Sequence, residues 1–217
     1  GTTAAATWDA VTGTYVGTYT PTAVSAGVTV TGKVDGASIS PTTDTLVVTI
    51  GPLSLVDSTL TTTASTYVAG SAGVTVQLTL KDEHANLRGG ASAATIGHEL
   101  DHGAFTALTT ALNAGVYEAT LDQTEAGECA IFATVDGVLG VALTSPTVTV
   151  TAAALDLSAS AVAVAPASVV AGHATTCTVT VVDQYSNARS GHTVLCDFGG
   201  TTAAATWDAV TGTYVGT

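Results

Sequence analysis

Residues 98–102 read His98-Glu99-Leu100-Asp101-His102, which matches the metalloprotease signature H-E-x-x-H. In such enzymes the two imidazoles lie one helical turn apart and hold a zinc ion, while the glutamate acts as a base. Here glycine, a poor helix former, flanks the motif on both sides, and no third ligand follows at a recognised spacing. We therefore expect a polar loop and no enzyme. The alternative is weak binding of a divalent ion by His98, Glu99, Asp101 and His102.

A second candidate chemistry is calcium binding by acidic residues at predicted turns, such as Asp35, Asp82, Asp136 and Asp183. Calcium takes about six to eight oxygen ligands converging on one point, and the sequence contains no dense D-x-D-x-D run. Asp-Gly and Asp-x-x-x-Asn form turns through bonds between the side chain and the backbone. We therefore predict turns and no cofactor. The alternative is a calcium ion at a module junction, with Asp44, Asp57 or Asp156 among its ligands.

The three cysteines offer redox chemistry. The first interpretation is three buried thiols. The alternative, if the protein is extracellular, is a disulfide between Cys177 and Cys196, which lie on two predicted strands that can face each other across a sandwich core. Cys129 aligns with Val28 or Thr29 of a related segment. The Thr29 alignment would expose Cys129 and allow it to link neighbouring chains.

The composition excludes several classes of partner. The 217 residues include 17 acidic and only 4 basic side chains, and the net charge of −13 disfavours nucleic acid and anionic membrane surfaces. No apolar run reaches the roughly 18 residues that a membrane-spanning helix needs, so no membrane insertion is predicted for this segment. The hydrophobic fraction of 46% is ample for a core, and the many Thr and Val residues favour strands.

The sequence contains a long exact repeat. Residues Gly1–Thr18 recur letter for letter as Gly200–Thr217, an offset of 199 from position 1 to position 200. Repetition at a fixed spacing is typical of modular proteins, so we expect a tandem array. The repeated aromatic residues, Trp8 with Tyr15 and Trp207 with Tyr214, are expected to pack in or cap a core rather than bind sugar.

A weaker repeat divides each period. Residues 169–194 align with 67–92, and residues 7–40 align with 107–140. Each period is therefore predicted to hold two related modules of roughly 100 residues, the usual size of a β-sandwich. On this basis 1–50 is the C-terminal half of one module, 53–152 is a complete module, and 155–217 is the N-terminal half of the next.

Alternating hydrophobicity predicts the strands. Val74, Val76, Leu78 and Leu80 alternate with Thr75, Gln77 and Thr79, as in a half-buried strand. Turn signals such as Asp-Gly and Gly-Gly recur at short intervals, and no long helical periodicity is present. The expected fold class is all-β, built from tandem immunoglobulin-like β-sandwiches.

Two segments carry a resemblance to known families. VVDQYSNARSG at 181–191 and LKDEHANLRGG at 80–90 resemble the strand–turn–strand of bacterial immunoglobulin-like repeats of the invasin and intimin type. The Gly-x-Tyr strands at 115–117 and 212–214 are also similar to filamin-type repeats. Both families are linear arrays that hold things at a distance or join cells and filaments, and neither has a catalytic site to transfer.

These observations predict a structural protein, a tandem-repeat segment of an extracellular filament, surface appendage or adhesin stalk at the cell surface. The expected partners are neighbouring copies of the same repeat or chain. The alternatives are an adhesive module that recognises a cell-surface or glycan ligand and an intracellular filamin-like cross-linker. We expect the missing half-modules to follow in one continuous polypeptide, and strand addition between subunits is the alternative.

Overall fold

The computed structural model shows an all-β protein. It describes residues 3–89, 94–98, 103–105, 109–110, 115–136, 138–139, 143 and 146–217, and within these ranges every regular element is a strand. The described part of the chain holds no helix that is long and apolar enough to cross a membrane.

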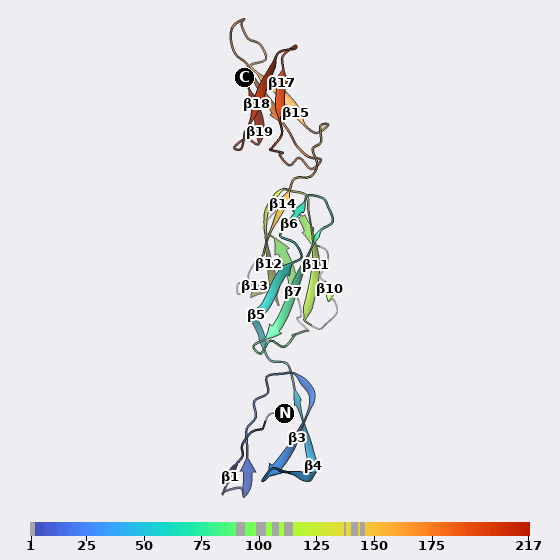
Figure 1. Ribbon diagram of the computed structural model, residues 1–217, viewed down its shortest axis with the longest axis vertical. Helices are drawn as coiled ribbons and strands as arrows, with labels where there is room; N and C mark the ends of the chain where they lie inside the picture. The colour runs from blue at the N-terminus through green and yellow to red at the C-terminus, as the bar shows by residue number, and fades with distance from the viewer. Residues whose placement is uncertain are drawn as a thin grey trace.

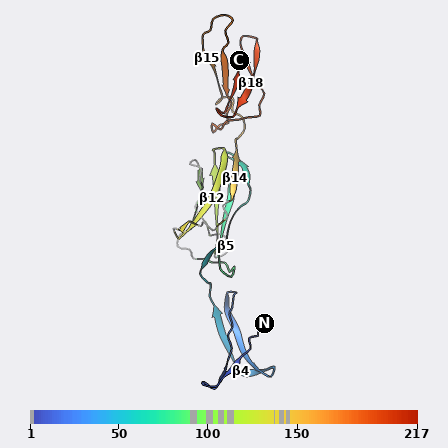
Figure 2. The ribbon, with the colours of Figure 1, turned by 90° about the vertical axis from the view of Figure 1, so that its left-hand side faces the viewer.

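Three bodies follow one another along the long axis of the molecule, and two views at right angles show the same row (Figures 1 and 2). We call residues 3–50 the first segment, residues 53–152 the middle module and residues 155–217 the third segment. The two ends of the chain lie in the opposite end bodies (Figure 1). The chain passes from one body to the next through short connections near residues 49–52 and 152–154.

The middle module contains two five-stranded sheets. One has the order β10-β11-β7-β5 with β9 also paired to β11, and the other has the order β13-β12-β14-β6 with β8 also paired to β12. All of the pairs are antiparallel except β14 with β6, which is parallel. The strands are β5 (Leu53–Thr62), β6 (Thr66–Val68), β7 (Val74–Asp82), β8 (Ala94–His98), β9 (Gly103–Phe105), β10 (Thr109–Thr110), β11 (Val116–Gln123), β12 (Gly127–Val135), β13 (Val138–Leu139) and β14 (Thr147–Thr151).

The main core of the described residues lies between these two sheets. In β7 the side chains alternate strictly between buried and half-buried, so the predicted alternation is confirmed. Inward-facing residues of β11, β12 and β14 meet them and form one apolar cluster; its fully covered members include Val76, Leu78, Leu121, Ile131 and Val148. Two packed sheets with alternating inner and outer residues are the structure expected of an immunoglobulin-like sandwich.

The end segments are organised differently. The first segment contains two separate hairpins, β1 (Thr7–Asp9) with β2 (Thr14–Val16) and β3 (Ser25–Val34) with β4 (Ala37–Val48). None of its described side chains is buried. The third segment forms one antiparallel sheet in the order β15-β16-β19-β18-β17, made from β15 (Ala161–Ala165), β16 (Thr176–Thr180), β17 (Val194–Asp197), β18 (Thr202–Asp208) and β19 (Thr213–Gly216).

Candidate functional site: the two module junctions

The sequence D-x-x-x-N-x-R occurs at both junctions between the three bodies. It spans 82–88 beside the first junction and 183–189 beside the second. Asp82 and Asp183 are fully buried, which is uncommon for a carboxylate unless its hydrogen bonds are satisfied. Two of the four basic residues of the chain are the arginines of these motifs. The two copies make the same set of contacts.

Each motif first builds its own turn. Oδ1 of Asp82 accepts hydrogen bonds from the N–H groups of His84 and Asn86, both at 2.9 Å. Oδ1 of Asp183 accepts the equivalent pair at 2.8 and 2.9 Å. The fourth residue of each turn has a left-handed backbone, with φ of 64° at Ala85 and 68° at Ser186. This part of the motif is an aspartate-stabilised turn, as its residue types predict.

The second carboxylate oxygen holds the connection between modules. Oδ2 of Asp82 accepts from the N–H of Gly51 at 3.0 Å, and Oδ2 of Asp183 accepts from the N–H of Ala153 at 2.7 Å. The backbone pairing next to the two aspartates is also equivalent, because Leu53 pairs with Asp82 and Leu155 forms a β-bridge to Asp183. Each connection is therefore tied to the following module as soon as the preceding module ends.

The asparagine of each motif reaches into the preceding body. Nδ2 of Asn187 donates to the carbonyl of Thr124 at 2.7 Å, and its Oδ1 accepts from the N–H of Ala126 at 2.8 Å. Asn86 makes the same two bonds to Thr22 and Val24, at 2.8 and 3.2 Å. One amide thus satisfies both a donor and an acceptor of a loop that belongs to the neighbouring body.

The arginine of each motif donates hydrogen bonds to the carbonyl groups of the connection. Nη1 of Arg88 donates to the carbonyl of Gly51 at 2.6 Å. Nη1 of Arg189 donates to the carbonyls of Ala152 and Ala153, at 3.0 and 2.6 Å. A charged donor on a main-chain carbonyl makes a stronger hydrogen bond than a neutral one. We call the Asp, Asn and Arg of each motif, with the bonds they make, the junction clamp.

The second junction has an additional aromatic contact. Gly70 lies in the turn after β6 with a left-handed φ of 67°, and a Cβ atom at this position would overlap Oη of Tyr185. The tyrosine of the third segment therefore packs directly on the bare backbone of the middle module. The first junction has His84 at the position that corresponds to Tyr185.

Hydrogen bonding keeps both clamp carboxylates ionised. Burial alone would raise the pKa of Asp82, but donors from the Asn86 side chain and from the N–H groups of Gly51, Asn86 and His84 outweigh it. The pKa therefore lies well below its ordinary value. The pKa of Asp183 is also lowered, because the equivalent donors of the second junction again outweigh burial.

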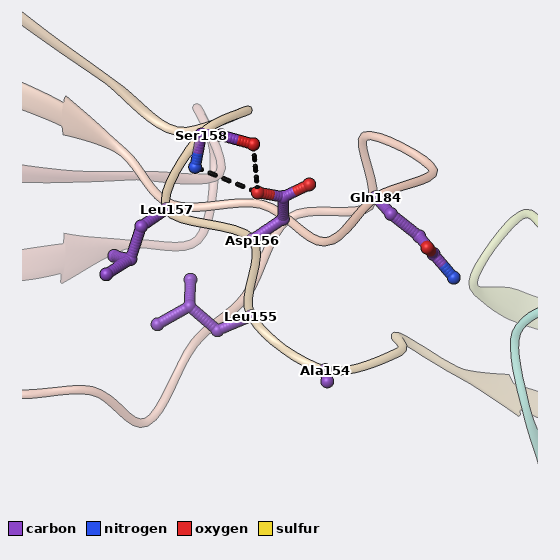
Figure 3. Close-up of a pocket in the computed structure, with 6 residues that line it drawn as sticks. All are labelled: Ala154, Leu155, Asp156, Leu157, Ser158 and Gln184. Carbon is purple, nitrogen blue, oxygen red and sulfur yellow. Dashed lines mark hydrogen bonds between the residues drawn. The ribbon is translucent and has the colours of Figure 1, made fainter.

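Beyond the second clamp the chain enters a tight turn. Oδ1 of Asp156 accepts from the N–H and the hydroxyl of Ser158, and these bonds lower the pKa of Asp156. Figure 3 shows Asp156 turned toward Ser158, whereas Gln184 on the neighbouring loop points away from it. This turn lines an open hollow together with Ala154, Leu155 and Leu157.

The metal candidates do not gather in the described part of the chain. His98 is the last residue of β8 and pairs with Ile131, so the motif begins on a strand and the expectation of a loop is wrong at this residue. Glu99, Asp101 and His102 lie outside the described residues. Asp57 accepts from the Ser54 hydroxyl and Asp44 from the N–H of Thr45. No group of three or more His, Cys, Asp or Glu side chains able to hold a metal occurs among the residues that the structure describes.

The cysteines fall into two environments. Cys177 on β16 and Cys196 on β17 form a disulfide, with their Cα atoms 6.5 Å apart. Cys129 lies on β12 opposite Val148 and has no exposed surface. The expectation that Cys129 is exposed and links neighbouring chains is therefore wrong. Its side chain faces the core, which agrees with the alignment of Cys129 with Val28 and not with Thr29.

Comparisons with known proteins identify the fold. No protein-family model and no curated protein matches the sequence. Among the solved structures that match most of the chain are three in which about a fifth of the aligned residues are identical. They are FdeC, an Escherichia coli adhesin (22% identity, TM-score 0.54, 88% of this chain and 63% of that chain), Yersinia pseudotuberculosis InvD (20%, 0.55, 86% and 58%) and invasin, a bacterial integrin-binding protein (22%, 0.56, 88% and 39%).

The chain spans less than two thirds of the length of each of these structures. At this level of identity the likeness shows the fold alone, which is the immunoglobulin-like β-sandwich fold that the domains of invasin share. The resemblance inferred from residues 80–90 and 181–191 is thereby confirmed at the level of fold.

Proposed function

We propose that this chain is a rigid, non-catalytic segment of a bacterial surface protein of the adhesin type, which holds its modules in line as part of a stalk or filament. The observation that carries the proposal is the repeated junction clamp. A flexible linker leaves adjacent modules free to reorient, which is the ordinary expectation for small polar interfaces between domains. Two copies of one hydrogen-bond set, each built on a buried aspartate and placed at successive junctions, favour a fixed direction instead.

Three further features support a place outside the cell. The disulfide between Cys177 and Cys196 suits an oxidising environment. The net charge of −13 suits a chain that stays soluble on a surface in contact with water. The invasin-type fold is shared with proteins described as an adhesin and as integrin-binding. The expected partners are further copies of the same repeat.

Small-angle X-ray scattering of the whole chain tests the rigid arrangement. The clamp variant carries Asn86→Ala and Asn187→Ala, which remove the side-chain hydrogen bonds from each motif to the preceding body. The matched control carries Glu83→Ala and Gln184→Ala, two exposed positions of the same turns. We expect the wild type and the control to give one extended, narrow distribution of sizes and the clamp variant a shorter, broader one. A clamp variant as extended and narrow as its control would contradict the proposal.

The surface assignment needs a separate test. Antibodies raised against the chain should label intact cells of the source organism without permeabilisation. Labelling that appears only after permeabilisation would count against an extracellular role.

A further inference from the structure

The two copies of the 18-residue repeat have different surroundings. Tyr214 is 2% exposed, whereas Tyr15, the same residue of the same sequence, is 70% exposed. Their local structures agree, because Tyr214 packs on Trp207 with ring centroids 5.1 Å apart and Tyr15 packs on Trp8 at 5.2 Å. The difference lies in the neighbours. β19 pairs with both β16 and β18, whereas β2 pairs with β1 alone.

The junction clamps align the first segment with the end of the middle module. Asn86 holds Thr22 and Val24 as Asn187 holds Thr124 and Ala126. Asp82 holds Gly51 as Asp183 holds Ala153. Strands β3 and β4 of the first segment therefore occupy the places that β12 and β14 have in the middle module.

Strand β14 and its counterpart β4 differ in how far their apolar side chains are buried. In the middle module Val148 and Val150 of β14 are buried against the opposite sheet. The corresponding residues of β4 are Leu46 and Val48, and Leu46 is 37% exposed. The hairpin of β3 and β4 has the apolar pattern of a core hairpin, but no sheet formed by the described residues covers it.

The third segment contains the other part of the same arrangement. β15 pairs with β16, and β19 with β16, in the same registers as β5 with β7 and β11 with β7. It contains no described strands that correspond to β12 and β14. Apolar side chains on its inner face are accordingly uncovered, among them Val162 and Val164, which pair with Val179 and Cys177. Val169 is also 43% exposed. β17 lies at the edge of its sheet, whereas β8 in the middle module pairs with β12.

We propose that the exposed apolar face of the third segment is the docking surface for strands β3 and β4 of a second copy of this sequence. The occupant is identified by the repeat, because in the first segment the 18-residue sequence is followed by these two strands. Together the two parts form a module built like residues 53–152. A second copy also matches the surface chemically, since both faces are apolar and carry few charges.

The middle module fixes the expected register. There β14 runs parallel to β6, with Thr149 opposite Thr66 and Val150 opposite Tyr67. The equivalent positions pair Val47 of the second copy with Ser168, and Val48 of the second copy with Val169. Because side chains alternate along a strand, Val47 and Ser168 would face outward together.

Lengthening the chain tests the contact directly. A copy of residues 19–50 is added after Thr217, so that both 18-residue sequences are followed by the same strands. We expect slower amide hydrogen exchange in β15, β16 and β17, and weaker binding of an apolar fluorescent dye. The control extension has the same length and carries Asp at the positions that correspond to Leu46 and Val48. Equal exchange and dye binding with the two extensions would overturn the proposal.

Engineered cysteines test the register. Ser168→Cys is combined with Cys at the added copy of Val47, and the control places the second Cys at the added copy of Thr45 on the same strand face. We expect oxidation to form a disulfide in the first variant and far less in the control. Equal yields would overturn the proposed pairing. In the unextended chain, Ser168→Cys with Val47→Cys gives a ladder of cross-linked oligomers if separate molecules supply the second copy, and monomers if only a continued polypeptide does.

Discussion

Nδ2 of Asn187 lies 2.8 Å from Oδ2 of Asp183, and the same side chain binds the backbone of the preceding module on its other side. The carboxylate orients the amide, and the amide supplies one of the donors that keep the buried carboxylate ionised. The two residues therefore act as one unit, and a change in either should alter both the turn and the junction.

Asn187→Asp is expected to loosen the second junction. The substitution keeps the shape of the side chain but replaces the Nδ2 donor with an acceptor that faces the Asp183 carboxylate and the Thr124 carbonyl. An unsatisfied buried polar group costs about 1–3 kcal/mol. Amide hydrogen exchange at Ala126 and Ala153 should accelerate by roughly tenfold or more, since each 1.4 kcal/mol of opening free energy is about tenfold in rate.

Gln184→Glu is the matched control, because it adds the same charge to the same turn at an exposed position. Its exchange rates at Ala126 and Ala153 should stay close to those of the wild type. Similar acceleration in both variants would mean that negative charge, and not the clamp geometry, controls the junction.

The junctions are expected to weaken in acid. The clamp carboxylates have pKa values below those of an unfolded chain, where aspartate has a pKa of about 3.9. Folding therefore favours their ionised form, and their contribution to stability is complete above that value. It is lost as the pH falls below about 4 and through the lower pKa of the folded state.

Scattering curves recorded from neutral pH down to about pH 2 measure this acid transition. The extended shape should persist to about pH 4 and then broaden. In a variant with Asp82→Asn and Asp183→Asn the change over the same range should be smaller, because the titrating groups are absent. An unchanged acid transition in that variant would assign the pH dependence to other carboxylates, such as the turn-forming Asp9, Asp156 and Asp208.

Gly70→Ala is expected to disturb the second junction through Tyr185. The new methyl group would overlap the tyrosine ring, and the left-handed backbone adds about 1 kcal/mol of strain of its own. Thermal unfolding of the single variants and of Gly70→Ala with Tyr185→Ala separates the two effects. The cost of Gly70→Ala should shrink to the backbone strain once the ring is removed. Additive costs would show that the ring moves aside freely.

Removal of the disulfide is expected to destabilise the third segment selectively. Cys177 and Cys196 close a loop with a sequence separation of 19, for which the loss of the cross-link costs about 3 kcal/mol. Urea unfolding of Cys177→Ser with Cys196→Ser, in a Trp8→Phe background, can be followed by the fluorescence of Trp207. The midpoint should fall for this transition, while exchange in the core of the middle module stays unchanged. An unchanged Trp207 midpoint would contradict the prediction.

The sequence was sufficient to predict features that depend on near neighbours. The alternation in β7 follows from a period of two, and the Asp-x-x-x-Asn turns follow from bonds between residues two to four apart. Both features appear as predicted. The environment of Cys129 was ambiguous, because a one-residue shift in the alignment moves a strand residue from the core to the surface.

The junction clamp could not be derived from either motif alone. Its asparagines bind residues 61 to 64 positions away, so the interpretation as simple turns accounts for Oδ1 of the aspartates and misses Oδ2 and the amides. One signal in the sequence did point to it. D-x-x-x-N-x-R recurs with identical spacing, and a chain with 4 basic residues places an arginine in each copy.

The parallel pairing of β14 with β6 determines how the middle module would respond to tension. The chain enters the middle module at β5 and leaves it from the end of β14, and these two points lie toward opposite ends of the module (Figure 1). Stretching would slide β14 along β6 in shear. The bonds between Thr149–Thr151 and Thr66–Val68 cross that direction, so they would share the force and break together instead of opening one after another. A pull along the molecule would thus meet its greatest resistance at the strand through which each module passes force to the next.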